Sequence, residues 1–417
     1  MKKEPLNNIA RTDVSKQMMC IGMCVLALIT AGWMMFLSTG FIFEGKPNFE
    51  NFNNLLDKRI VVTFVGAALM VFLWLVPVTA IRKSGKWLMI LGAIFLAAVL
   101  WTPLGVSIRG SRRWLDLIAF TFQPLEFVKV AMVIYLSNYF ASNYPLRKHE
   151  PLSAIAPLGA ALILILMVAV QTDLSGAGIL FLVALTLAIM AGLHPKTLAI
   201  SLASIGFVFM GVLAFKPDKL ERIFIPITPL HDLGAEGYQS TISIGAITNG
   251  EWFGRGAGES IAIYSLPDHL TDFIFSVICE EWGLIGGIIL IAVFTILIVS
   301  MFTIAFRQKE IFRVFLGSGI AAMITYQAAI HILVTTRLFP STGQPLPFVS
   351  EGGSSFLAAI AGIGIMLNLG RSINDEPEIL SAKKPVRIKK EEILSRKPQR
   401  PDFSRRTASS SGRRRVI

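Results

Sequence analysis

The chain contains a series of apolar runs that are each long enough to cross a lipid bilayer. A hydrocarbon core of roughly 30 Å takes about 20 helical residues at about 1.5 Å per residue. The runs lie near 17–40, 60–81, 87–106, 125–142, 152–171, 176–194, 197–215, 273–305, 312–336 and 354–370. Because lipid leaves no partner for unpaired backbone groups, we predict an all-α integral membrane protein with about ten transmembrane helices.

Composition supports a membrane protein. Only 16% of the 417 residues are charged and the mean hydropathy is +0.63, whereas a soluble chain carries about 25% charged residues. Cys20, Cys24 and Cys279 all lie in apolar runs, which offers neither a disulfide framework nor a metal-binding spacing. The first run lacks a small-residue cleavage site, so we expect a retained span and not a signal peptide.

The charge distribution divides the chain into three parts. We expect a cytoplasmic segment over 1–16, a membrane domain over 17–370 and a basic, disordered cytoplasmic tail over 371–417. The tail holds 14 Lys or Arg and 6 Asp or Glu of a chain whose net charge is +12. Most of the positive excess is therefore in a tail that can lie on anionic membrane lipids. We do not expect a nucleic-acid partner.

Basic residues between the runs give the orientation. They follow every second run, which makes that side cytoplasmic and places both termini inside. These residues are Arg82, Lys83, Lys86, Arg147, Lys148, Lys196, Arg307, Lys309 and Arg313. The large loop 216–271, with 4 Lys or Arg against 7 Asp or Glu, falls on the outer side.

Asp272 stands at the outer start of the apolar run 273–305, in the segment LPDHLTDFIF. A carboxylate at the mouth of a span is costly unless it faces protein or water, which makes it a candidate functional residue. The alternative is an ordinary helix cap, because Thr-Asp before an apolar run is a common N-cap pattern. The local sequence leaves both open.

Two further groups of charges lie on the outer side. Arg109, Arg112 and Arg113 stand there against the orientation rule, which suggests contact with an anionic headgroup or phosphate; simple tolerance of a short loop is the alternative. Glu126 and Lys129 are three residues apart and share a helix face. They are either a self-satisfied buried ion pair or part of a polar cavity, and spacing does not separate the two.

The remaining outer segments have turn-forming sequences. Asp173 falls in a very short turn, where a helix cap is the simplest role. The glycines of 250–258 are a weak signal for nucleotide binding because no strand precedes them, and we expect a folded loop with short helices. Prolines and glycines in 337–355 exclude a continuous helix. We predict a re-entrant segment that lines the same cavity as Asp272.

Taken together, these motifs resemble those of the SEDS family (shape, elongation, division and sporulation), which includes the bacterial FtsW, RodA and SpoVE proteins. The matching segments are GSRRW at 110–114, QPLEFVK at 123–129, QTDL at 171–174, GYQS at 237–240, LPDHLTDFIF at 266–275, EEWG at 280–283 and TGQPLPFVSEGGSS at 342–355. They occur in the family's order and extend from Ser107 to Ser355.

The resemblance implies a peptidoglycan glycosyltransferase that polymerises lipid II at the outer face of the bacterial cytoplasmic membrane. It also implies a class B penicillin-binding protein, a transpeptidase, as partner. The basic tail and N-terminal extension favour an FtsW-like role at the division septum with other divisome proteins, and a RodA-like elongation polymerase is the alternative. The family's essential acid falls on Asp272, and its intramembrane Glu and Lys fall on Glu126 and Lys129.

Several positions depart from the family pattern. Leu270 separates His269 from Thr271, Thr121 stands where a basic residue is often found, and Glu351 replaces a common tyrosine. The family's QPDLG is QTDLS here.

The implied reaction needs a base for a sugar hydroxyl and positive charge for the lipid diphosphate. We expect Asp272 to be the base and direct attack to invert the donor linkage. Candidates for the diphosphate are Lys129 and Arg112, followed by Arg109 and Arg113; further substrate-binding candidates are Glu126, Gln123, Gln239 and Ser354. A divalent cation, Mg²⁺ or Mn²⁺, could share the charge, although the sequence has no all-protein metal cage.

Two other classes of protein share some of these features. A lipid-precursor flippase or secondary transporter would also have many spans and intramembrane charges. The sequence shows no internal repeat, however, and its charged motifs gather on the outer side and not at the midplane. A non-enzymatic scaffold that recruits a transpeptidase is the third hypothesis.

Overall fold

The structure is a computed structural model that describes residues 4–43, 46–108, 111–117, 121–144, 155–201 and 235–382, with single residues at 203, 206 and 211. Residues up to Asn374 form one compact unit, and a second unit begins at Asp375. Of the predicted tail 371–417, the structure describes residues 371–382, which form the end of a helix, and the rest lies outside the described residues.

Helices dominate the described residues, which confirms the predicted fold class. They are α1 (Glu4–Thr39), α2 (Phe49–Leu75), α3 (Val78–Trp101), α4 (Pro124–Ser142), α5 (Ile155–Val170), α6 (Leu174–Met190), α9 (Ala235–Asn249), the 3₁₀ turn η4 (Ala262–Tyr264), α10 (Ile274–Phe306), α11 (Ile311–Thr335) and α12 (Gly353–Ala382).

Six described helices are long and apolar enough to cross a membrane, namely α1, α2, α3, α10, α11 and α12. Helices α5 and α6 are apolar but shorter, and α4 carries Glu126 and Lys129. The predicted run 197–215 lies mostly outside the described residues, so the total of ten spans stays a prediction.

The boundary between the second and third helices differs from the prediction. Asn48 caps α2 by accepting a 3.0 Å hydrogen bond from the amide of Asn51, so the helix begins well before the apolar run at 60. Pro77 occupies the N-cap of α3, which begins about one and a half turns before Lys83. Arg82, Lys83 and Lys86 consequently lie inside α3 and not in a loop. The hydropathy pattern did not predict that the mostly polar residues 49–59 form the first turns of α2.

Short strands were not predicted. Strands β3 (Gly105–Ile108), β4 (Ser111–Asp116) and β5 (Thr121–Phe122) form an antiparallel sheet in the order β3-β4-β5. We had predicted an outer loop for this segment. Strands β1 (Ile42–Phe43) and β2 (Lys46–Pro47) form a second antiparallel pair. The small sheet matters because it determines which side chains of GSRRW face the site.

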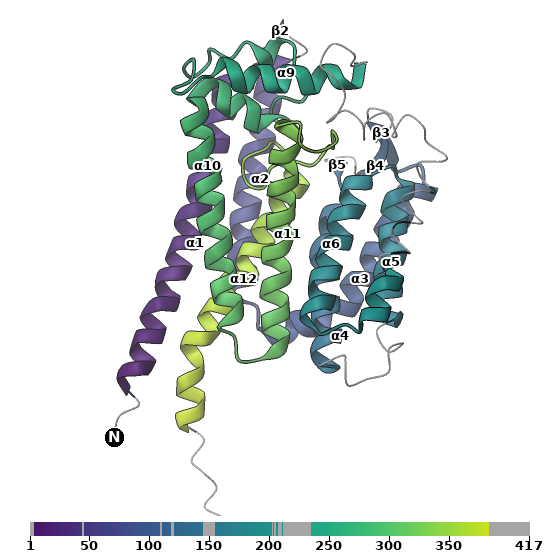
Figure 1. Cartoon of the computed structure of the whole chain (residues 1–417), viewed down its shortest axis with the longest axis vertical. Coiled ribbons are helices and arrows are strands. Elements are labelled where there is room, and N and C mark those ends of the chain that lie inside the picture. The colour runs from purple at the N-terminus through teal and green to yellow at the C-terminus, as the bar shows by residue number, and fades with distance from the viewer. Residues whose placement is uncertain are drawn as a thin grey trace, which may run out of the picture. The chain divides into compact units, whose positions relative to one another are not determined.

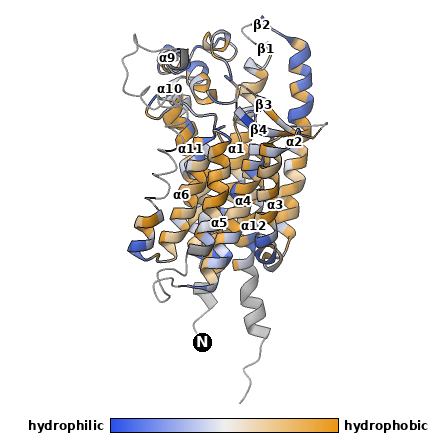
Figure 2. Cartoon of the chain, turned by 90° about the vertical axis from the view of Figure 1, so that its right-hand side faces the viewer, coloured by the Kyte–Doolittle hydropathy of each residue, from blue (hydrophilic) through white to orange (hydrophobic). Residues whose placement is uncertain are grey.

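The helices pack in a connected series around α11. Helix α10 packs against α1 and α11, α11 also contacts α4 and α6, and α4 contacts α3, α5 and α6. Figure 1 shows α1, α10 and α11 on one side of this unit and α3 to α6 on the other. Hydrophobic residues fill the helical body, and hydrophilic residues gather toward its ends (Figure 2), as expected for a protein whose middle lies in lipid.

The loop between α9 and α10 is attached to α10 through its own EEWG motif. The buried carboxylate of Glu280 accepts hydrogen bonds from the amides of Ile261 (3.3 Å) and Ala262 (3.1 Å). The amide of Gly258 donates to Glu281 at 3.0 Å. Gly283 has a φ of +73° and approaches the loop so closely that an added Cβ would lie 2.3 Å from a backbone oxygen of Trp252. This attachment explains EEWG, and the described part of the loop, from residue 235 on, is folded with short helices as predicted.

Candidate functional site

Asp272 lies in a tightly turned segment directly before α10. The amides of Thr271 and Asp272 donate to the carbonyl of Asp268, at 2.9 and 3.0 Å, and Asp268 itself has a φ of +61°. Asp tolerates this left-handed conformation better than most residues. The N-cap residue of α10 is Phe273, so Asp272 stands one residue earlier than the capping alternative requires. Its side chain is half-buried.

The irregular segment after α11 passes next to the carboxylate of Asp272. A Cβ added to Gly343 would lie 3.4 Å from Oδ2 of Asp272 and 3.7 Å from Nη1 of Arg113. The acid, the guanidinium and this backbone position are thus neighbours, although they come from three distant parts of the chain. Residues 344 and 346–350 are buried in protein, which agrees with the predicted irregular segment lining the site of Asp272.

Arg113 reaches across from β4 to the turn between α5 and α6. Its Nη2 donates to the carbonyl of Thr172 at 2.6 Å, and its Nη1 lies 3.7 Å from Oδ2 of Asp173. Asp173 is also the N-cap of α6, since its Oδ1 accepts from the amide of Gly176 at 2.8 Å. The predicted cap is confirmed, and Asp173 has the additional role of orienting Arg113.

Gln344 joins the irregular segment to the same turn. Its Nε2 lies 3.3 Å from both Oδ1 of Asp173 and Oγ of Ser175, while its backbone carbonyl lies 2.9 Å from Nδ1 of His331 on α11. Both Gln344 and His331 are buried. These contacts fix the backbone beside Gly343, and hence the space between Asp272 and Arg113.

Lys129 and Glu126 form a second, fully buried layer. Each is 1% exposed, and the Lys129 ammonium lies 2.8 Å from both carboxylate oxygens of Glu126. The third partner is Gln327, whose Oε1 accepts from Lys129 at 2.7 Å. Gln327 in turn donates to the carbonyl of Pro345 and to Ser355, at 3.0 and 2.8 Å. The ion pair is therefore connected to the middle of the irregular segment at Pro345 and to the first turn of α12 at Ser355.

Arg112 has a different environment from its neighbour. Its Nε and Nη1 donate to the carbonyls of Gly105 and Leu100, at 3.1 and 3.4 Å, and its Nη2 donates to Thr102. The guanidinium thus holds β4 to the end of α3. We ranked Arg112 above Arg113 from the sequence, and the geometry favours Arg113 as the cation next to Asp272.

The other predicted site residues are dispersed around this centre. The backbone amide of Gln123, just before α4, donates to Ser354 Oγ at 3.1 Å, which joins α4 to the start of α12. Gln239 is half-buried on α9. Arg109 lies outside the described residues. No group of three or more His, Cys, Asp or Glu that could hold a metal ion occurs within the described part of the chain.

His269 is close in sequence to the acid but is used differently. It is buried, with Nε2 lying 3.4 Å from the carbonyl of Thr39. Burial lowers its pKa, and backbone hydrogen bonds only partly oppose this effect. The ring is therefore neutral at neutral pH. It connects the Asp272 segment to α1.

The sequence did not single out Gln327, His331 and Gln344. Gln327 and His331 were detectable, because they are polar residues four apart on one face of an otherwise apolar run. Gln344 bonds to His331 and Asp173, and Gln327 bonds to the next residue, Pro345. Together these contacts support the segment beside a half-buried acid and an arginine. An acid that can take a proton beside a cation that can bind an anion is suited to transferring a group from a phosphate ester.

Comparison with known proteins supports the same class of reaction. The sequence model of the FtsW/RodA/SpoVE family, described as cell cycle protein, matches residues 18–375. A probable peptidoglycan glycosyltransferase FtsW from Marinobacter nauticus is 30% identical over 371 residues, which are 87% of this chain and 92% of the relative. Stage V sporulation protein E of Bacillus subtilis is 30% identical over 348 residues, 83% of this chain and 94% of the relative.

Solved structures share the fold. A structure described as a peptidoglycan synthase complex that coordinates polymerisation and crosslinking has a TM-score of 0.68 at 24% identity, covering 85% of this chain and 98% of that one. The rod shape determining protein RodA of Thermus thermophilus has a TM-score of 0.60 at 23% identity, covering 84% and 96%.

Proposed function

Because the chain belongs to the FtsW/RodA/SpoVE family of cell cycle proteins, we propose that Asp272 and Arg113 are the reactive centre of a peptidoglycan glycosyltransferase. The chain is a membrane glycosyltransferase of the FtsW type. The observation that carries the assignment of residues is the convergence of Asp272 and Arg113 on the backbone at Gly343.

The substrate that fits this chemistry is lipid II, a disaccharide peptide on an undecaprenyl diphosphate. Asp272 takes the proton from the 4-hydroxyl of the acceptor sugar. The hydroxyl oxygen forms a bond to the anomeric carbon of the donor, and the bond from that carbon to the diphosphate breaks. One direct displacement converts an α-linked donor to a β-linked product. Lipid diphosphate leaves with the bonding electrons.

Arg113 is the cation that this leaving group would meet. A planar guanidinium binds a diphosphate through two parallel hydrogen bonds, and Asp173 fixes its orientation. Lys129 is 1% exposed, so we assign it a positioning role through Gln327 and Ser355 and not direct contact. A divalent cation, Mg²⁺ or Mn²⁺, would enter with the diphosphate, and no described acidic cluster is built to hold one.

The surroundings of the reaction are part of the proposal. We place the site at the outer face of the cytoplasmic membrane, with both termini inside and with action at the division septum. A class B penicillin-binding protein is the expected partner, together with other divisome proteins. Support comes from a structural neighbour whose description joins polymerisation to crosslinking. A RodA-like elongation role is the alternative.

The test is glycan synthesis by purified protein. The chain and its candidate partner, in detergent and without a membrane gradient, should convert lipid II to glycan strands that are resolved on a gel. Asp272→Asn should lower the rate by roughly 10²–10⁴-fold, the usual contribution of a general base, without lowering the melting temperature. Glu259→Gln, an exposed acid of the outer loop, is the control and should retain activity. Rapid synthesis by the Asp272 variant would sink the assignment.

A further inference from the structure

Two exposed lysines on α3 have no acidic partner in the part of the chain that the structure describes. Lys83 and Lys86 are three residues apart, so both project from one face of the helix, and both are exposed. Among the described residues neither ammonium group has a hydrogen-bond or ion-pair partner. The sequence between Asp57 and Asp116 contains no acid, so neither α3 nor the second half of α2 can supply one. This end of α3 therefore carries an uncompensated double positive charge.

The neighbouring arginine has a different role. Arg82 donates through Nε to Asn138 on α4 and through Nη1 to Glu310, both at 2.8 Å. The second carboxylate oxygen of Glu310 lies 3.2 Å from Nε of Arg313. The acid is thus already shared between two arginines, and Arg82 holds α3 to α4 and to the turn before α11. The two lysines take no part in these described contacts.

The depth of the lysines in the membrane makes their charge costly. At about 1.5 Å per residue, Lys86 lies about 22 Å along α3 from Trp101, the exposed indole at the other end of the helix. A hydrocarbon core is roughly 30 Å thick, and tryptophans concentrate at its boundaries. A helix with Trp101 at one boundary therefore has Lys86 inside the other. The lysine stems can extend toward the membrane surface, but the ammonium groups still need an anion or water.

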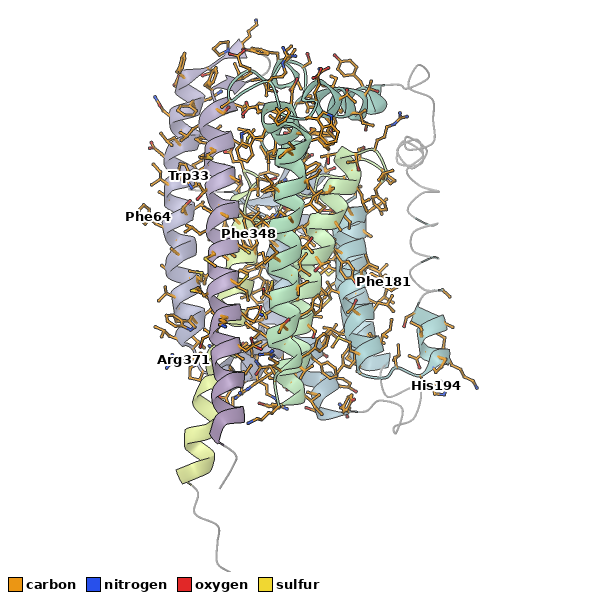
Figure 3. The ribbon with its side chains drawn as sticks, turned by 60° about the vertical axis from the view of Figure 1, so that its left-hand side comes forward. Trp33, Phe64, Phe181, His194, Phe348 and Arg371 are labelled. Carbon is orange, nitrogen blue, oxygen red and sulfur yellow. The ribbon has the colours of Figure 1, made fainter. Side chains whose placement is uncertain are left out.

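The surface around the lysines is apolar. Trp87 directly follows the second lysine and is 71% exposed, and Ile90 is exposed on the same face one turn later. Phe72 and Leu75 are exposed at the end of α2, and Phe64 on the same helix points away from the helical body (Figure 3). An anion that binds here must itself be compatible with lipid, which argues against a soluble nucleotide or an acidic peptide.

The lysines lie far from the proposed reactive centre. Their neighbour Arg82 contacts Glu310 in the turn after α10, whereas Asp272 directly precedes α10. The 33 residues of that helix extend over about 50 Å. Figure 3 also shows Arg371 near the end of the helical body that lies away from the outer loop. A ligand on the two lysines is therefore distinct from the substrate of the proposed reaction.

We propose that Lys83 and Lys86 bind the phosphate of an anionic phospholipid. Two ammonium groups on one helix face meet the negative charge of one headgroup. The indole of Trp87 lies beside its glycerol region, where tryptophan side chains are favoured, and its acyl chains cover Ile90 and Leu75. A zwitterionic phospholipid gains less, because its own ammonium group competes for the phosphate. The surface is thus selective for lipid charge.

Fluorescence quenching in vesicles tests this proposal on the full chain. Equimolar vesicles of phosphatidylcholine and phosphatidylglycerol are prepared with brominated acyl chains on one lipid or on the other, so that total bromine is constant. The contribution of Trp87 is the difference between the wild type and Trp87→Phe. Brominated phosphatidylglycerol should quench this contribution more strongly, with a preference of roughly fivefold in apparent affinity. High salt should lower that preference.

Charge variants distinguish a binding site from general attraction to the membrane. Lys83→Gln with Lys86→Gln should abolish the preference, and Lys83→Arg with Lys86→Arg should retain it. Lys16→Gln with Lys196→Gln removes the same charge from two other exposed lysines and should leave the preference unchanged. All four side chains are exposed, so the variants should fold, and their melting temperatures check this.

Equal quenching by the two brominated lipids would overturn the proposal, as would a preference that survives in the double glutamine variant. An equal loss of preference in the variant of Lys16 and Lys196 would indicate general attraction and would also overturn it. Undecaprenyl diphosphate that displaces brominated phosphatidylglycerol more readily than unlabelled phosphatidylglycerol does would overturn it in favour of a polyprenyl ligand. Glycan synthesis enters none of these measurements, so a failure of the proposed function would leave the test unaffected.

Discussion

The amide nitrogen of Glu351 donates a 2.9 Å hydrogen bond to the carbonyl oxygen of Leu270, two residues before Asp272. The neighbouring Ser350 Oγ donates to Thr271 at 2.7 Å and accepts from the amide of Leu346 at 2.8 Å. The turn that carries Asp272 is therefore held in place by a segment about eighty residues further along the chain. Activity should depend on this segment even where it does not touch substrate.

Ser350→Ala tests that dependence. The substitution leaves the buried amide of Leu346 and the half-buried carbonyl of Thr271 without their partner, at a cost of about 1–3 kcal/mol for such groups. We expect kcat for glycan synthesis to fall roughly fivefold to tenfold, with little change in KM because substrate contacts are intact. Ser300→Ala is the control, since Ser300 is also buried, on α10, and its hydroxyl makes a weak 3.5 Å hydrogen bond to Cys20. Equal kcat values for the two variants would contradict the role of Ser350.

Arg113 and Arg112 should respond differently to substitution. Arg113→Met should lower kcat/KM by roughly 10–100-fold, which corresponds to losing a charged hydrogen bond of about 1.5–3 kcal/mol. Arg112→Met should chiefly lower the melting temperature, because Arg112 binds three carbonyls at the end of α3. Arg113→Lys keeps a charge near Asp173 and controls for misfolding. Similar losses of kcat/KM in Arg112→Met and Arg113→Met would contradict this difference and indicate that both arginines bind substrate.

The sequence predicted most accurately the helices whose bounds hydropathy alone defines. The predicted runs 273–305 and 312–336 agree within one residue with α10 and α11, because an uninterrupted apolar stretch has no other stable form in lipid. The neighbourhood of Asp272 and the 337–355 segment was also expected. Prolines and glycines there require irregular backbone, which the membrane tolerates only inside protein.

The choice between Arg112 and Arg113 could not be made from the sequence. Successive side chains of a strand point to opposite faces, so adjacent arginines have different partners once β4 exists. Nothing in a basic, turn-flanked segment indicated a strand. The role of Gln327 could not be predicted for a related reason. The partners of a single polar residue in a helix are unknown until the packing is known, and those of Gln327 lie on α4 and in the 345–355 segment.

Glu351 should make stability depend on pH. Burial raises the pKa of its carboxyl above the usual value of 4.5, and Arg59 and Lys58 only partly offset this. Between 4.5 and the raised pKa, the folded protein holds more protons than the unfolded chain, so stability falls as pH rises through that window. Glu351→Gln cannot ionise and should lack this contribution. Melting temperatures of both proteins across pH 4–8 check the sign; a wild type that gains stability relative to the variant as pH rises would contradict it.

Orientation can be measured with single cysteines. Phe253 is 84% exposed in the loop before α10, and Lys309 is exposed in the turn between α10 and α11. In a background with Cys20, Cys24 and Cys279 replaced, Phe253→Cys should react with a membrane-impermeant maleimide on intact cells, whereas Lys309→Cys should react only after lysis. The reverse pattern would place Asp272 on the cytoplasmic side and remove the basis for an outer-face polymerase.

Variants of the buried pair Glu126 and Lys129 should separate effects on protein stability from effects on glycan synthesis. Removing either charge alone leaves the other uncompensated and should destabilise the protein by about 3–5 kcal/mol. The double variant Glu126→Gln with Lys129→Met removes both charges and should fold. It should nevertheless polymerise lipid II poorly, because Gln327 then loses the ammonium that anchors its contacts to Pro345 and Ser355.

The matched control for that variant is Gln327→Met in the wild-type background. It breaks the same connection while leaving the ion pair in place, so it should reproduce much of the loss in kcat with KM little changed. Thermal melting and glycan synthesis should be measured on the same preparations. A double variant that is both stable and fully active would show that Glu126 and Lys129 only satisfy each other, and positioning of the segment beside Asp272 would then depend on Gln344, Ser350 and Asp173 alone.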